Sequence, residues 1–160
     1  WLGQLLSLRS RLGLRNSAHS LVKLLDPLAH QGLRSIVVGS YTHPEYVELM
    51  LQTLAQRKMY AVLSRGLEGE VACDPRRQPR YDGVLAGEPL VLAEQQSGTA
   101  AEVPGLPSAI DVASTAAYTR AVLAGELPVP AALAQQVRLI VGVAQRALDA
   151  SSSLAVAPVA

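Results

Sequence analysis

The chain has 160 residues, of which 49% are hydrophobic and 17% are charged, and its formal net charge is +1. These proportions are typical of a folded globular domain and exclude intrinsic disorder for most of the chain. No apolar run approaches the ~18 residues that span a bilayer. A single cysteine, Cys73, excludes an internal disulfide framework and a multi-cysteine zinc site. Since the N-terminal residues also lack a secretory-signal pattern, we expect a cytoplasmic protein with no membrane partner.

The first 28 residues predict two helices. Leucines within residues 4–12 recur on one helical face, which is typical of an amphipathic helix. Asn16 and Ser17 are favourable N-cap residues for a second helix, which carries further leucines at helical spacing. Pro27 predicts that this helix ends near residue 25 or 26.

Residues 35–66 predict a strand–helix–strand unit. The run SIVVGSY over residues 35–41 is apolar without alternation, which indicates a strand buried on both faces. His43 and Pro44 open an amphipathic helix, and YAVLSRG over residues 60–66 predicts a second buried strand. Such a unit places its two strands parallel. The inner face of the helix is expected to consist of Val47, Met50, Leu51 and Leu54.

The second half of the chain predicts a loop, a hairpin and two helices. Residues 66–81 are rich in glycine, proline and arginine and predict a long surface loop. Residues 84–94 predict two short strands that join at Gly87-Glu88, and helices are expected at about 110–124 and 130–149. The fold class is therefore α/β, with a partial, mostly parallel sheet flanked by helices. The domain is expected to cover 1–148, followed by a flexible tail at 149–160.

The small net charge conceals an asymmetry between the two halves. Residues 1–80 hold eleven basic and six acidic side chains, a balance of +5, whereas residues 81–160 hold three and seven, a balance of −4. Clustered basic side chains indicate an anionic partner such as nucleic acid, although two solvated faces would explain the same pattern. The residues that we expect to contact nucleic acid are Arg9, Arg11, Arg65, Arg76, Arg77 and Arg80.

Residues 15–23 form a candidate anion site. Arg15 lies at the entrance of the second predicted helix, whose first turn offers unpaired N–H groups, and His19 and Lys23 follow at intervals of four residues. Together with Asn16 they predict a polar, cationic stripe. The alternative is that Arg15 pairs with a neighbouring acid.

Two further positions carry weaker predictions. Glu68 and Glu70 follow the second strand, where two carboxylates would hold Mg²⁺ through water; alternatively they are solvated loop acids. Cys73 lies near two arginines, which favours a thiol of lowered pKa, although most lone cysteines in loops are inert. The chain contains none of the common catalytic motifs, such as a phosphate-binding GxxxxGK[ST] loop or a GxSxG elbow.

Three runs of residues carry a resemblance to a known family. They are RLGLRNSAHSLVKLL at residues 11–25, RGLEGE with DPRRQP within residues 65–79, and LAGELPVPAALAQQV at residues 123–137. In these runs the chain resembles the C-terminal half of the anthranilate phosphoribosyltransferase-like superfamily (glycosyltransferase family 3). The likeness is to its DNA-binding YbiB-type branch in particular, and it covers about residues 1–148.

This resemblance implies a function and a set of partners. Arg15 matches an arginine that faces the aromatic amine in the enzymes, but the acidic metal-binding pair is replaced by the sequence Glu68-Gly69-Glu70. The loop that holds phosphoribosyl pyrophosphate is absent from these residues. The resemblance therefore implies a non-catalytic protein without a cofactor, which dimerises through an N-terminal helical domain and binds nucleic acid without sequence preference.

The alternative implied by the same resemblance is an enzyme. With its N-terminal half present, the protein would transfer a pentosyl or phosphoribosyl group from phosphoribosyl pyrophosphate to an aromatic amine or base, with Mg²⁺ as cofactor. Aromatic residues make up only 4% of the chain and phenylalanine is absent, so backbone electrostatics rather than base stacking would dominate nucleic-acid binding.

Overall fold

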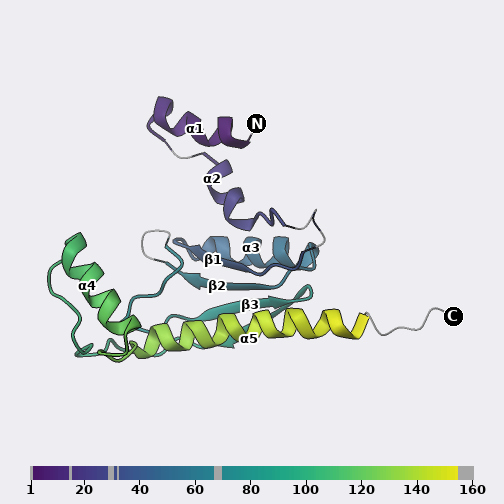
Figure 1. The fold of residues 1–160 in the computed structure, drawn as a ribbon. Coiled ribbons are helices and arrows are strands. Elements are labelled where there is room, and N and C mark those ends of the chain that lie inside the picture. The colour runs from purple at the N-terminus through teal and green to yellow at the C-terminus, as the bar shows by residue number, and fades with distance from the viewer. Residues whose placement is uncertain (1, 15, 29–30, 32, 67–69, 155–160) are drawn as a thin grey trace.

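The computed structural model describes residues 2–14, 16–28, 31, 33–66 and 70–154. The described chain folds into helices packed against one four-stranded sheet (Figure 1). In chain order the elements are α1 (Leu2–Leu12), α2 (Ala18–Leu21), the 3-10 turn η1 (Val22–Leu24), β1 (Val37–Tyr41), α3 (Glu45–Gln56), β2 (Ala61–Arg65), β3 (Tyr81–Leu85), β4 (Glu88–Ala93), α4 (Val112–Leu123) and α5 (Ala131–Leu154).

The α/β fold class is confirmed, and the sheet is open with the strand order β1-β2-β3-β4. β1 and β2 are parallel, as a strand–helix–strand unit requires, with Val37 opposite Ala61. β3 runs antiparallel to both β2 and β4. The sheet is therefore mixed rather than mostly parallel, because a hairpin supplies its last two strands.

The sheet lies between α3 on one face and α5 on the other (Figure 1). Alternate side chains of β2 lie on opposite faces of the sheet. Leu63 packs with Leu54 of α3, whereas Val62 packs with Val143 of α5. This alternation explains why the strand is apolar throughout, since a strand covered on both faces has no solvent side. The predicted inner face of α3 is confirmed in the core cluster.

The hairpin between β3 and β4 turns one residue earlier than expected. Ala86 and Gly87 form the turn with φ values of 53° and 97°, and Glu88 already belongs to β4. Two consecutive residues at positive φ are typical of the tight turns that suit twisted antiparallel strands. Glycine tolerates that backbone conformation without the steric cost of a Cβ atom.

Three helix boundaries differ from the expectation. The second predicted helix is short, because α2 and η1 end at Leu24 and the backbone of Leu25 is already extended. α4 begins at Val112, after Asp111 caps it by accepting from the N–H of Ser114 at 2.9 Å. α5 continues to Leu154 instead of ending near residue 149, and the rest of the predicted tail lies outside the described residues.

The two peripheral helices contribute little to the core. Neither α1 nor α4 contains a buried residue, and Figure 1 shows both lying away from the sheet. α1 is tied to the chain beyond it by Asn16, whose side-chain amide donates to the carbonyl of Leu5 at 2.6 Å. Within the part of the chain that is described, no helix is long and apolar enough to cross a membrane.

Candidate functional site

The long loop between β2 and β3 is anchored to α5 by one buried side chain. Gln136 is only 5% exposed, accepts from the backbone N–H of Cys73 at 3.0 Å and donates to the carbonyl of Val71 at 2.6 Å. A buried amide that satisfies two backbone groups holds the loop in one position. The arginines that follow in the loop are therefore presented from a fixed base.

Cys73 does not fit the prediction of an activated thiol. Its side chain is buried, and burial raises the pKa of the thiol above its usual value. The neighbouring arginines lie close in sequence, but both engage Asp74 instead. The structure therefore favours the inert alternative for this cysteine.

Two of the residues predicted to contact nucleic acid share one carboxylate. Arg76 forms a bidentate ion pair with Asp74, in which Nε and Nη2 lie 2.9 Å and 2.8 Å from the carboxylate oxygens. Nε of Arg77 lies 3.8 Å from the same carboxylate. The hydrogen bonds from Arg76 lower the pKa of Asp74 below its ordinary value. The side chains of Arg76 and Arg77 are nevertheless 54% and 51% exposed. This group of three residues therefore keeps a surplus of one positive charge at the surface.

Arg80 is more fully neutralised. Its guanidinium lies 2.8 Å from the buried carboxylate of Asp82 and 3.3 Å from that of Glu94. The charge of Asp82 also acts on Tyr41, at the end of β1. Burial and this charge raise the pKa of the Tyr41 hydroxyl. Since two carboxylates face one cation, Arg80 supplies little net charge for an anion.

The other three predicted arginines lie in different places. Arg9 and Arg11 occupy the last turn of α1, and Arg65 ends β2; all three are exposed. No ion pair involves them within the described ranges. Figure 1 shows α1 at the opposite side of the molecule from α5. The structure thus divides the predicted cationic cluster into separate groups instead of bringing it together.

The described side chains of the predicted anion site on the second helix form hydrogen bonds within the chain. Arg15 lies outside the described residues. Asn16 accepts from the N–H of Ala18 at 3.0 Å, and Nδ1 of His19 lies 3.3 Å from the N–H of Asn16. Lys23 reaches the sheet and donates from Nζ to the carbonyl of Ser40 at 3.2 Å. These three side chains bind the chain itself, and the anion site remains a prediction from the sequence.

The predicted metal pair is only partly described. Glu68 lies outside the described residues, and Glu70 is exposed. Among the residues with described side chains, no group of three acidic, histidine or cysteine side chains lies close enough to hold a metal ion. The Mg²⁺ site therefore remains a prediction from the sequence.

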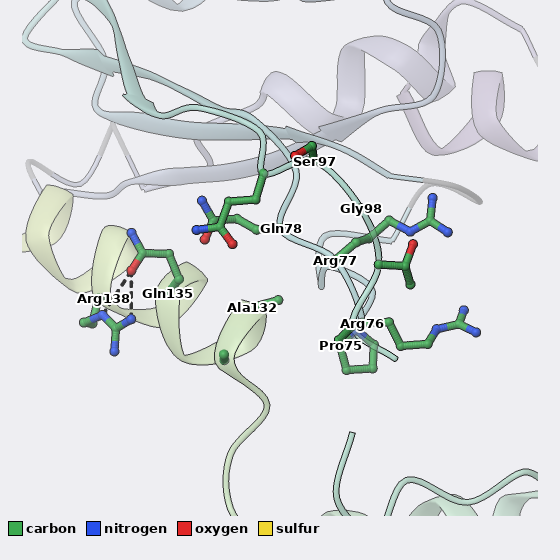
Figure 2. A pocket seen from close by; sticks show the side chains of 13 residues that line it. Pro75, Arg76, Arg77, Gln78, Ser97, Gly98, Ala132, Gln135 and Arg138 are labelled. Atoms are coloured by element: carbon green, nitrogen blue, oxygen red, sulfur yellow. Dashed lines mark hydrogen bonds between the residues drawn. The ribbon is translucent and has the colours of Figure 1, made fainter. Parts of the chain in front are cut away.

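A hollow of ≈ 570 Å³ lies between the first turns of α5 and two loop segments that precede and follow the hairpin (Figure 2). Its lining contains three arginines and no acidic residue. Arg138, which is not among the residues predicted to contact nucleic acid, comes from α5, whereas Arg76 and Arg77 come from the loop. The remaining lining is mostly polar or small: Pro75, Gln78, Gln96, Ser97, Gly98, Thr99, Ala100, Ala131, Ala132 and Gln135.

Comparison with known proteins gives a similarity over most of the chain. The chain is 35% identical over 151 residues to the uncharacterized protein YbiB of Escherichia coli (strain K12). This chain is similar to YbiB. The alignment covers 94% of the chain but 46% of YbiB, so the chain spans about half the length of that relative. No family model matches the chain. The predicted relationship to YbiB is thereby confirmed, and the similarity describes sequence without assigning an activity.

Proposed function

We propose that this chain belongs to a non-catalytic protein that binds nucleic acid through exposed groups of basic side chains without sequence preference. The observation that carries the proposal is the group formed by Arg76, Arg77 and Asp74. Two guanidinium groups share a single carboxylate and remain about half exposed. Guanidinium groups pair favourably with phosphate, and each phosphate that is neutralised releases bound counterions.

The proposal of binding without sequence preference rests on the kind of contact that the surface offers. Exposed arginines on a loop and on α1 are suited to phosphates, which carry no sequence information directly. Stacking of bases requires exposed aromatic rings, whereas Tyr41 and Tyr81 are buried. Tyr46, 48% exposed on α3, is a single ring and does not make a platform by itself. Electrostatic contact with the backbone is the mode that this surface supports best.

The test is a titration of labelled single- and double-stranded oligonucleotides at several salt concentrations. We expect R76E/R77E to weaken binding to both and to flatten the dependence of affinity on salt, because two phosphate contacts are lost. The matched control is R57E/R120E, which changes the net charge equally at two exposed arginines outside the hollow. Absence of binding by the unmodified protein at low salt would refute the proposal, as would equal losses in the two double variants once circular dichroism has shown both to be folded.

We further propose that the chain is the C-terminal part of an anthranilate phosphoribosyltransferase-like domain that dimerises through a preceding helical domain. The support is the three sequence runs described above, together with a length of about half that of YbiB. The sequence that encodes the residues before Trp1 tests this directly. A glycine-rich phosphate loop followed by a lysine-containing strand would favour the alternative of pentosyl transfer, which release of pyrophosphate from phosphoribosyl pyrophosphate would then measure.

A further inference from the structure

We propose that the hollow between α5 and the loop segments around Arg76 and Ser97 is the place where the phosphodiester backbone docks, with Arg138 as its principal contact. The inference rests on the proposed function and deepens it, because it assigns the binding to one surface and to a residue outside the predicted clusters. Three features of the hollow support it: its charge, the state of Arg138, and the character of its walls.

The charge of the hollow is positive and only partly compensated. Three arginine residues contribute to its lining, which includes no aspartate or glutamate. Asp74 lies beside the lining and pairs with Arg76 and Arg77, which leaves three positive charges against one negative charge. A concave surface with excess charge of one sign concentrates counter-ions more strongly than a flat surface does. The hollow is thus the part of the loop surface where an extended anion is held best.

Arg138 differs from the loop arginines in its partner. Its side chain is exposed, and Nε and Nη2 donate to the neutral Oε1 of Gln135 at 3.2 Å and 2.8 Å (Figure 2). No carboxylate pairs with it within the described ranges. A guanidinium has five N–H donors, so these two bonds leave three to other acceptors. Gln135 therefore orients the cation without neutralising it, which is the state that suits a phosphate.

The walls of the hollow favour a charged polymer over an apolar ligand. In Figure 2 the helix presents Gln135 and Arg138 on one side, and the loops present Gln78 and Ser97 across from them. Pockets for small molecules are mostly apolar and enclosed, with few polar groups. This open hollow instead offers amide and hydroxyl groups beside its arginines, which are the groups that contact phosphate and sugar in nucleic-acid complexes.

The sequence does not predict Arg138 as a contact, because no cluster of basic residues surrounds it there. It lies in the half of the chain whose charge balance is −4, and about 60 residues separate it from Arg76. Only the packing of α5 beneath the sheet brings its helical turn to the loop that Gln136 anchors.

The test compares two single substitutions on the same helix, in the full chain, with labelled oligothymidylate as the probe. R138Q removes the proposed contact, and R146Q removes an exposed arginine that does not line the hollow. We expect R138Q to weaken binding about fivefold and to reduce the slope of log affinity against log salt by about 0.7, the value for one contact with a single strand. R146Q is expected to leave the affinity and the salt slope unchanged within experimental error. R138K, which keeps the charge, is expected to restore the slope.

The outcomes separate this inference from the function on which it rests. If the unmodified chain fails to bind oligothymidylate or duplex DNA at low salt, the proposed function is wrong and the inference is wrong with it. If the chain binds and R138Q matches R146Q in affinity and slope, the function stands and the hollow is not the docking place. A loss in R138Q that R138K does not restore identifies a structural role for Arg138 and also overturns the inference.

Discussion

Gln136 and Cys73 lie 63 residues apart in sequence and are joined by a buried hydrogen bond of 3.0 Å from the backbone N–H of Cys73 to Oε1 of Gln136. The same amide donates to the carbonyl of Val71 at 2.6 Å. One side chain on α5 therefore holds the loop that carries Arg76 and Arg77. The position of this loop against the helix creates the hollow that Arg138 shares, so the integrity of the candidate site depends on this contact.

Substitution of Gln136 tests that dependence. We expect Gln136→Leu to lower the free energy of unfolding by about 2 kcal/mol, because it leaves two backbone groups without their partner, one of them at buried Cys73. Chemical denaturation measures the change. Gln145→Ala, on the exposed face of the same helix, is the control and should cost less than about 0.5 kcal/mol. Similar losses in the two variants would contradict an anchoring role.

The ion pair of Asp74 predicts a dependence of stability on acid pH. Because the pKa of Asp74 in the folded chain lies below its ordinary value of 3.8, the ionised carboxylate stabilises the fold at neutral pH. This contribution is lost as the pH falls below 3.8 and through the lowered pKa. Thermal unfolding of the unmodified chain and of D74N should therefore differ at pH 7 and converge in strong acid. A difference that is constant over this range would show that the two arginines do not stabilise the carboxylate.

The same substitution has an opposite effect on the proposed function. In the unmodified chain Asp74 competes with phosphate for Arg76 and Arg77. We expect D74N to bind oligonucleotide more tightly at low salt and to show a steeper loss of affinity with salt, because more cationic contacts become available. Glu126→Gln, which removes one exposed negative charge outside the hollow, controls for net charge. Weaker binding by D74N than by this control would mean that Asp74 positions the arginines for the ligand.

Two glycines predict opposite changes in stability. A Cβ atom at Gly83 in β3 would lie 2.7 Å from the Leu92 side chain, which packs in the core beneath α5. We expect Gly83→Ala to destabilise the chain by about 1–3 kcal/mol through overpacking. Gly142 lies inside α5 with nothing within 4 Å of such an atom, so Gly142→Ala should stabilise by about 0.5–1 kcal/mol. Denaturant midpoints measure both changes, and a neutral Gly83→Ala would indicate that Leu92 is free to move aside.

The fold was predictable wherever a local pattern specifies the element. The continuous apolar runs at 35–41 and 60–66, with an amphipathic helix between them, predicted β1, α3 and β2 and their parallel pairing. The hairpin was predicted to within one residue of its turn. These features depend on the periodicity of neighbouring side chains and on chain connectivity, which are both properties of the linear sequence.

The candidate site was predictable only in part. The sequence placed Arg76 and Arg77 on a surface loop, and that loop does line the hollow. It did not reveal that Asn16 and Lys23 bind the backbone of α1 and β1, because each of these bonds joins residues 11 to 17 positions apart. Helical spacing describes which residues share a face, but it does not determine what that face contacts.

The linear sequence by itself determined the α/β class, the order of most elements and the excess of positive charge in residues 1–80. Only the tertiary structure decided which cations meet distant partners: Glu94, 14 residues away, pairs with Arg80, and α5 brings Arg138 to the same hollow as Arg76 and Arg77. The physical reason is that net charge adds along a chain regardless of distance, but an ion pair forms only where two groups come within a few ångströms. For Arg80 and Glu94, that distance is set by the pairing of β3 with β4.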